Sequence, residues 1–506
     1  MVKNGSHFDF VVVAGRLAEN PNVSVLVVEA GIGNPQDIHE ITTPSSAMGL
    51  RGSKHDWAYK TTMVKRDDYE RIEKPNTRGK ALGGSSSLNY FTWVPGCKPT
   101  FDMWEEYGGK EWTWDPLVPY LRKSATYHDD LGLYSKDLQK LGKGGPLPIS
   151  HAELLGDLQP FRDLLTEAWK DRGGTLTENI YDGEMIGLTH CVDTIYKGQR
   201  SGSFLFVKNK PNITILPEVH SKKLIIDEAS RDFYATREVI LSQGVFESPK
   251  LLMLSGIGPK NELSKHGITT LIDSRHVGQN LLDHPGVPFV LKVKDGYGMD
   301  DHLLRAGPKH DGAISAFSKG HAGPMGSGLL EMVGFPRIDS YLEKDAQYRE
   351  RKAANGGKDP FCPGGQPHFE LDFVAIPTFF ADDLDIIAMR EGIRFSYDVL
   401  TKGKGFKDIV LAEYPWEMPL DNDEEMHHAV LDRCQTAFHP CGTARLSKNI
   451  DQGVVSPRLK VHGISKLRVI DASVIPVIPD CRIQNSVYMV GEKGADLIKA
   501  EHKDLY

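Results

Sequence analysis

Two short apolar runs near the start of the chain predict buried strands. Phe8–Val13 and Val23–Val28 are rich in valine. Runs of this length and composition are typical of strands that a parallel sheet buries on both faces. The second run ends at Glu29. A dinucleotide-binding βαβ unit closes in the same way, because an acid after the second strand binds a ribose hydroxyl.

Weaker apolar runs recur in the middle of the chain and near its end. Leu224–Ile226, Val239–Leu241 and Leu467–Ile470 are further strand candidates, and Glu492–His502 has the pattern of a helix. The stretches between these runs differ in character. The pattern therefore predicts one α/β domain assembled from several segments, with a second domain inserted between them.

The link between the first two strands is too short for the usual unit. Only nine residues, 14–22, separate the two apolar runs, whereas a parallel crossover with its helix needs at least about ten to twelve. Of a phosphate-binding GxGxxG loop, only Ala14 and Gly15 remain. We expect that these strands can hardly pair in parallel through a full helix, and that the phosphate-binding helix N-terminus is lost. A hairpin or short connection unrelated to nucleotides is the alternative.

Composition excludes several classes of protein. The 506 residues are 40% hydrophobic and 25% charged, which allows two domains or one two-lobed domain. The net charge is −8 and the cations are interleaved with acids, which argues against a nucleic-acid partner. No apolar run is long enough for a membrane span, and the start MVKNGSHFDF lacks a secretory pattern. Six cysteines without a CxxC indicate free thiols rather than disulfides or a zinc site.

Five further segments have motif-like sequences, each of which also has a plain structural interpretation. GKALGGSSSLN can wrap backbone amides around a phosphate or a flavin, and GVFESPKLLMLSGIGP predicts a helix stopped by glycine. The segments are residues 79–89, 244–259, 277–285, 439–446 and 467–498.

In this order, the five segments resemble the glucose–methanol–choline (GMC) oxidoreductase family. The first two fit the family's two signatures, except that Val245 stands where a small residue is usual. NYFTWVPG, FHPCGTARL and PDCRIQN bring the chain closest to a fungal branch that oxidises formate. The resemblance implies a Rossmann-like FAD-binding α/β domain with an incomplete βαβ unit, and an inserted α+β substrate domain built on an antiparallel sheet. The FAD-binding domain would comprise residues 1–90, 200–285 and 445–506, and the substrate-binding domain with connecting segments residues 91–199 and 286–444.

The implied activity is hydride transfer from formate to FAD, giving carbon dioxide, with O2 reduced to H2O2. The alternatives are oxidation of a small primary alcohol, or a deletion variant that holds no FAD. In that branch FAD is also known in a form modified at the 8-position. The expected partners are a small-molecule substrate and O2, without nucleic acid or membrane. The expected location is intracellular, in the cytoplasm or the peroxisome, and the oligomeric state is open, with a homodimer as one option.

The resemblance assigns two catalytic positions. His439 would face the flavin, and Arg482 stands where alcohol-oxidising members carry His or Asn. An arginine offers a planar fork that fits a carboxylate and cannot act as a base for an alcohol. Arg482 would therefore fix the formate anion, and His439 would orient the substrate and stabilise reduced oxygen. On residue type alone, His439 would be structural and Arg482 a surface ion-pair partner; His284 and His462 are interpreted as structural.

The implied cofactor contacts are spread over the whole chain, and no metal site is expected. The assigned residues are Glu29 at the adenosine ribose; Val219 at adenine, through its backbone; Gly83, Gly84 and Ser85 at the pyrophosphate or isoalloxazine; Asn89 at the flavin ring; Asp471 and Ala472 at the pyrophosphate and ribityl chain; and Gln484 and Asn485 at the start of the final helix, whose N-terminus would face the flavin pyrimidine.

Three places depart from the family pattern, each with clean flanks. The glycine loop is the first; the second is the link of about seven residues at Glu228–Tyr234, and the third is FELDFVAIPTFFADDLD (369–385), where several strands are missing. Lost strands leave neighbouring edges unpaired and remove buried apolar area. Three explanations remain open: coding segments lost through misread exon boundaries, a degenerate or regulatory paralogue, and a working variant that binds FAD without the loop.

Overall fold

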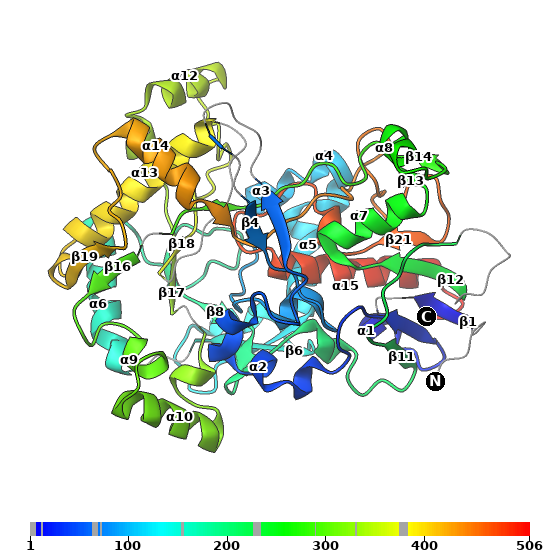
Figure 1. Ribbon diagram of the computed structural model, residues 1–506, viewed down its shortest axis with the longest axis horizontal. Coiled ribbons are helices and arrows are strands. Elements are labelled where there is room, and N and C mark those ends of the chain that lie inside the picture. Colours follow the sequence, from blue (N-terminus) through cyan, green and yellow to red (C-terminus); the bar gives the residue numbers. More distant parts are fainter. Residues whose placement is uncertain are drawn as a thin grey trace.

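A five-stranded parallel sheet lies at one end of the molecule (Figure 1). The computed structural model describes residues 7–11, 14–62, 69–70, 73–152, 156–225, 234–288, 290–328, 331–373 and 383–506. The sheet has the order β11-β2-β1-β12-β21, and every neighbouring pair is parallel. Its strands are β1 (His7–Val11), β2 (Val25–Val28), β11 (Ile213–Leu216), β12 (Tyr234–Leu241) and β21 (Leu467–Val469). The sheet is therefore assembled from three distant parts of the chain, as the apolar pattern predicts.

β1 and β2 pair in parallel although the described part of their link holds no full helix, so the βαβ unit is incomplete, as expected. Phe10 lies opposite Val25, and Val11 lies opposite Leu26. β2 begins at Val25, two residues later than the apolar run, and residues 14–24 of the link hold only the single helical turn α1 (Ala14–Leu17). Val12 and Val13, at the junction, lie outside the described residues.

The weaker strand candidates have mixed outcomes. Val239–Leu241 lies in β12, and Leu467–Ile470 contains β21. Leu224 and Ile225 form no strand, because the Leu224 N–H donates to the Ser255 hydroxyl (2.8 Å) instead of a strand partner. The edge strand is β11, which the apolar pattern missed.

Besides several two-stranded sheets, the described residues form two three-stranded sheets outside the parallel one. The sheet β18-β17-β7 is antiparallel, as expected for the inserted part, and β5-β6-β8 is mixed. Their strands are β18 (Leu371–Asp372), β17 (Met332–Phe335), β7 (Gly187–His190), β5 (Ala125–His128), β6 (Leu147–His151) and β8 (Val192–Asp193). The second and third departures fall largely on residues 226–233 and 374–382, which lie outside the described residues. The proposed domain boundaries stay a prediction.

Helices pack around the parallel sheet and around the antiparallel sheet β18-β17-β7. The helices around the antiparallel sheet lie at the end of the molecule opposite β1 and β2 (Figure 1). The longer ones are α5 (Trp114–Lys123), α6 (Gln159–Asp171), α7 (Gly244–Leu254), α10 (Pro308–Gly320), α12 (Ala346–Ala354), α13 (Asp383–Tyr397), α14 (Asp423–Arg433) and α15 (Gln484–Glu501). The predicted helix Glu492–His502 is thus the second half of α15, whose start the pattern missed. None of the described helices has the length and apolarity of a membrane span.

Helix α15 links the parallel sheet to the middle of the molecule. It packs along α5, where Lys123 bonds Asp496 (2.8 Å). Its Glu492 side chain is buried and receives the Arg16 guanidinium from α1 (2.7 Å). A buried carboxylate needs such a partner. These contacts fix the direction of α15, and so the position of its first turn.

Candidate active site

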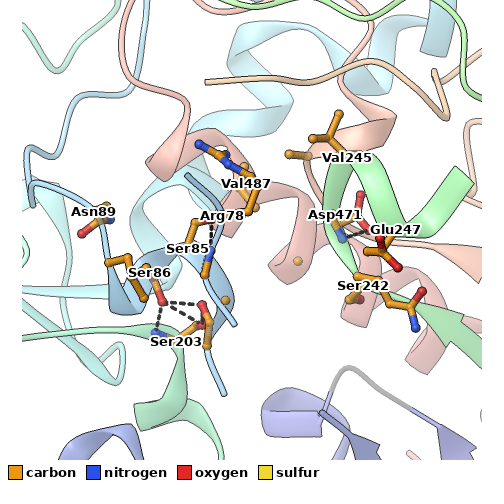
Figure 2. A pocket seen from close by; sticks show the side chains of 18 of the residues that line it. Arg78, Ser85, Ser86, Asn89, Ser203, Ser242, Val245, Glu247, Asp471 and Val487 are labelled. Atoms are coloured by element: carbon orange, nitrogen blue, oxygen red, sulfur yellow. Dashed lines mark hydrogen bonds between the residues drawn. The ribbon is translucent and has the colours of Figure 1, made fainter. Parts of the chain in front are cut away.

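One cavity of about 610 Å³ brings together nearly all the predicted site residues. Figure 2 shows part of its lining, including the serine-rich loop on one side and Asp471 and Glu247 on the other. Every predicted site residue except Asn485 lines it: Glu29, Gly83, Gly84, Ser85, Asn89, Val219, His439, Asp471, Ala472, Arg482 and Gln484.

The parallel sheet explains why distant residues meet here. Glu29 follows β2, Ser242 follows β12, and Asp471 follows β21 by one residue. Because the strands are parallel, these residues share the carboxyl edge of the sheet, where α/β proteins bind ligands. Gly15 of α1 reaches the same edge.

At the sheet end of the cavity, Glu29 and Val219 are fixed to each other. The Val219 N–H donates to the Glu29 carbonyl (2.9 Å), which leaves the Val219 carbonyl as the backbone group able to meet a base. The Glu29 carboxylate accepts the Gly31 N–H (2.7 Å), and burial raises its pKa. The strand end therefore presents an acid beside a backbone edge, as the predicted adenosine site requires.

The Gly-Ser loop is held in a tight turn. Gly83 has a φ of 93°, a left-handed conformation that glycine adopts most readily. The Ser86 hydroxyl donates to the Gly83 carbonyl (2.7 Å) and accepts the Ser203 N–H (2.9 Å). Asn89, at the end of the loop, donates to the Gln484 side chain on α15. The loop and the α15 N-terminus thus form one wall.

Arg200 supports this loop, and no motif singled it out. Its guanidinium donates to the Asn89 carbonyl (2.9 Å) and to the Asn89 side-chain oxygen (2.7 Å). Among the described residues, no carboxylate forms an ion pair with Arg200. Burial lowers its pKa to about 9. A buried cation therefore lies directly behind the loop.

His439 contacts a second histidine. The His439 and His284 Nδ1 atoms are 3.1 Å apart, with the rings nearly perpendicular. One Nδ1 must carry a hydrogen and the other accept it, so the two tautomers are coupled. Burial lowers the pKa of His284 to about 4; burial, followed by the charges of His284, Arg482 and Arg78, places that of His439 well below its usual value. Both rings are therefore neutral near pH 7.

The backbone around His439 is anchored from two sides. The Asp283 carboxylate accepts the N–H groups of His439 (3.0 Å) and His284 (2.9 Å). The Arg78 guanidinium donates to the Phe438 carbonyl (2.5 Å), and Phe438 has a φ of 65°, a strained conformation that needs such support. Sequence reasoning missed Asp283, Arg78 and the contact of His284. The Asp-His-Pro sequence at the end of VGQNLLDHP could have indicated Asp283 and His284.

Arg482 forms ion pairs with two carboxylates of the protein itself. Its Nη1 lies 2.6 Å from Glu370 Oε1, and its Nη2 lies 2.5 Å from Asp372 Oδ2. Burial lowers the Arg482 pKa, but the two acids outweigh burial and hold it above its usual value. Glu370 and Asp372 alternate along an extended segment and so share a face. The alternating acids of the E-L-D sequence could have revealed that two carboxylates lie on one face, but not that Arg482 pairs with them.

Asn485 is the one predicted residue that lies away from the cavity. Residues 484, 487, 488, 491 and 492 of α15 line the cavity, which matches the helical repeat. The Asn485 side chain is buried beside Trp93 and Leu121. It therefore supports the helix from behind.

The lining fits FAD in most respects. The volume lies in the range of small-molecule sites, the strand-end acid and the glycine turn are present, and the buried Tyr90 hydroxyl in the lining has no hydrogen-bond partner among the described residues. The phosphate end is the exception, because α1 supplies only one helical turn. Gly83, Gly84 and Ala472 would have to hold the pyrophosphate without a long helix behind it.

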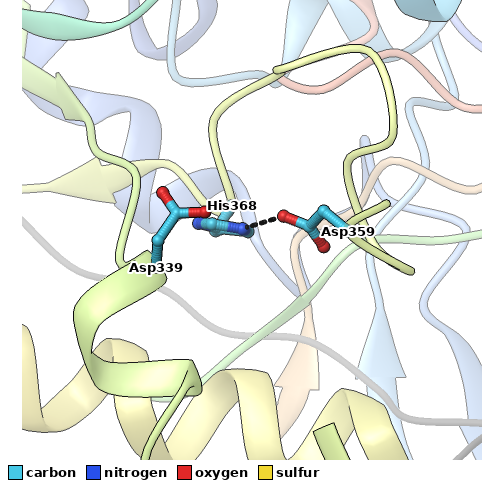
Figure 3. A group of neighbouring side chains, drawn as sticks. All are labelled: Asp339, Asp359 and His368. Carbon is cyan, nitrogen blue, oxygen red and sulfur yellow. Dashed lines mark hydrogen bonds and ion pairs between the residues drawn. The ribbon is translucent and has the colours of Figure 1, made fainter. Parts of the chain in front are cut away.

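A second cluster, Asp339, Asp359 and His368, is formed by metal-type ligands (Figure 3). His368 Nε2 bonds Asp359 (2.6 Å), and its Nδ1 accepts the Ile338 N–H (2.9 Å). Arg337 contacts both Asp339 (2.6 Å) and Asp359 (2.8 Å). Both ring nitrogens and the acids already have partners, so the cluster is an ion-pair network. It lines neither the cavity nor its mouth.

Comparison with known proteins gives a consistent result. Residues 71–286 and 366–491 match family models described as GMC oxidoreductase. A crystal structure of formate oxidase is 70% identical, with a TM-score of 0.97 and full coverage of both chains. A mutant structure of the Aspergillus oryzae formate oxidase, concerned with FAD modification, is 69% identical over the same coverage, with a TM-score of 0.97.

A curated relative also shows that the chain is internally short. The GMC oxidoreductase family protein Mala s 12 of Malassezia sympodialis is 25% identical, with 98% of this chain and 93% of the relative covered. Their alignment extends over 579 positions, at least 73 more than the 506 residues of this chain. The missing positions therefore lie inside the matched span, as the three departures imply.

Proposed function

Because the chain belongs to the GMC oxidoreductase family and is an FAD-dependent oxidoreductase, we propose that it oxidises formate to carbon dioxide, with O2 reduced to H2O2. The observation that carries this proposal is Arg482, which lines the same cavity as His439. The 70% identity to formate oxidase supports it.

Arg482 and His439 have separate roles in the proposed reaction. FAD supplies the hydride acceptor when bound. Arg482 binds the formate carboxylate through its planar fork and so aims the C–H bond. His439, neutral because its pKa is lowered, donates or accepts one hydrogen bond at the substrate without adding charge. Formate has no hydroxyl proton to lose, so the absence of a base at position 482 does not hinder the reaction.

Oxidation of a small primary alcohol is the second candidate. The neutral His439 could accept a hydroxyl proton, and the Asp372 carboxylate also lines the cavity. Arg482 gives such a substrate no partner for its fork, which is why formate is preferred. The 8-position modification of FAD, the use of O2 and a homodimer stay proposals beside it.

The test begins with the flavin. We expect the purified protein to release FAD on heating, and formate to bleach the flavin absorbance in the absence of air. Admission of air should then give one H2O2 per formate. Bleaching by methanol or ethanol but not by formate would favour the alcohol reaction, and protein that takes up no FAD would exclude both activities for this chain.

A further inference from the structure

Arg482 has one positive charge and forms ion pairs with two acidic side chains. The binding of another anion at the substrate end of the cavity is therefore disfavoured. Glu370 and Asp372 lie 2.6 Å and 2.5 Å from its guanidinium nitrogens, and all three side chains are less than one-fifth exposed. With both carboxylates ionised, the triad carries a net charge of −1. Formate would raise it to −2 in a region shielded from water, where like charges repel strongly.

The other groups around the triad do not remove this difficulty. Strand β17, which pairs with β18, contributes no titratable side chain. Asp193 of β8 interacts with Arg482, and burial raises its pKa to about 7, so it adds a third acid. Burial raises the pKa values of the Cys191 and Cys481 thiols well above their usual range, and His284 and His439 are neutral. Arg482 is thus the main cation that faces the acids among the described residues.

We propose that formate binds in this site only while Glu370 holds a proton, and that formate then replaces the Glu370 carboxyl group on Arg482. The inference rests on the proposed function and specifies how the substrate charge is accommodated. Glu370 takes up this proton as formate binds above about pH 8, and already holds it below that pH. The neutral Glu370 gives up its place on Nη1 to a formate oxygen, so the triad with formate carries a net charge of −1 rather than −2.

The proton also fits the balance of the whole reaction. One formate anion, one proton and one O2 give one carbon dioxide and one H2O2, so each turnover consumes one proton. Hydride leaves formate with the electron pair of its C–H bond, and neutral carbon dioxide departs from Arg482. Glu370 can then return to the guanidinium after passing its proton on.

Glu370 suits this role better than Asp372. Asp372 lines the cavity, whereas Glu370 lies behind it and is the less exposed of the two. Burial is the main cause that raises the pKa of Glu370, which favours its protonated form. A proton held there is shielded from solvent but remains next to the place that it vacates.

The first test is the pH dependence of formate use by the holoenzyme. Because the pKa of Glu370 is raised to about 8, the KM for formate should stay nearly constant below that pH and rise about tenfold per pH unit above it. Glu370→Gln should flatten this rise and lower the KM at pH 9 by about tenfold. Glu331→Gln is the matched control, because Glu331 is also a buried partner of an arginine, Arg162 (2.5 Å), away from Arg482; its profile should follow the wild type.

The second test needs no turnover and does not depend on the variant folding. Calorimetric titration of the wild type with acetate, a carboxylate with no transferable hydride, in two buffers of different ionisation enthalpy measures the protons taken up on binding. We expect about one proton per acetate at pH 9, above the raised pKa of Glu370, and close to none at pH 7. A value near zero at pH 9, or a rise of KM that persists in Glu370→Gln, overturns the proposal, since the proton would then be absent or travel on the substrate. No bleaching by formate at any pH would instead overturn the proposed function.

Discussion

At the substrate end of the cavity, His439 is held by Asp283, Arg78 and His284, whereas at the phosphate end the supporting helix is a single turn, Ala14–Leu17. The substrate end is thus fixed by several independent contacts from distant parts of the chain. The phosphate end has lost the feature that normally supplies backbone N–H groups to a pyrophosphate. The difference teaches that the geometry of the substrate end does not depend on a full helix at the phosphate end.

Restoring the missing loop is the most direct test of the difference between the substrate end and the phosphate end. Insertion of a GxGxxG loop and helix between Val13 and Ala14 should raise FAD affinity by on the order of 100-fold. Two charge-assisted hydrogen bonds to phosphate contribute about 3 kcal/mol, which corresponds to that factor. Retention of flavin after gel filtration and a binding titration measure the effect.

An insertion of equal length that lacks glycine and helix formers is the matched control, and we expect it to leave the FAD affinity unchanged. If both insertions behave alike, the short link is a working variant and the contrast between the two ends disappears. A transcript that encodes extra residues between positions 13 and 16 would show instead that the short link results from a misread exon boundary.

Arg482→Ala should produce the next largest effect, on the KM for formate. Loss of a charged hydrogen-bonded contact costs up to about 3 kcal/mol, so we expect the KM to rise by up to roughly 100-fold while the rate of flavin reoxidation changes little. Arg482→Lys, which keeps the charge without the fork, should recover part of the affinity. Because Ala leaves Glu370 and Asp372 buried without a partner, the Tm should also fall. An unchanged KM in the Ala variant would rule out the clamp.

Asp283→Asn tests whether the substrate end is held as firmly as its contacts indicate. Asparagine keeps one acceptor but loses the second carboxylate oxygen, so either the His439 N–H or the Thr436 hydroxyl loses its partner. We expect kcat to fall about tenfold, or about 1.4 kcal/mol, with KM and FAD content unchanged. Asp129→Asn is the control, since Asp129 accepts backbone N–H groups in a loop away from the cavity. A loss of flavin without a change in kcat would contradict a positioning role.

Glu29→Gln should have the smallest effect and act only on cofactor binding, at the predicted adenosine site. Replacing a charged acceptor of a ribose hydroxyl with a neutral one costs about 1 kcal/mol, so FAD affinity should fall about fivefold without any change in the KM for formate. The loop-restored protein gives the background in which such a change can be measured by titration. Glu40→Gln, an exposed acid, is the matched control; equal losses in both variants would remove Glu29 from the site.

Local sequence was enough for the parts of the fold and site that depend on neighbours along the chain. The apolar runs located four of the five parallel strands, and the residues that follow strands, Glu29 and Asp471, met at one edge because parallel strands align their carboxyl ends. Strand β11 was missed because its place in the sheet depends on pairing with β2, which no local pattern contains.

What only the tertiary structure decided are the contacts between distant segments. Glu370 and Arg482 are 112 positions apart, and His284 and His439 are 155 apart. The sequence by itself marked Arg482 as a cation suited to a carboxylate and His439 as a flavin-facing histidine. It could not show that two acids already share that cation, or that the histidine is neutral, because charge in a buried site depends on which groups the fold brings within a few ångströms.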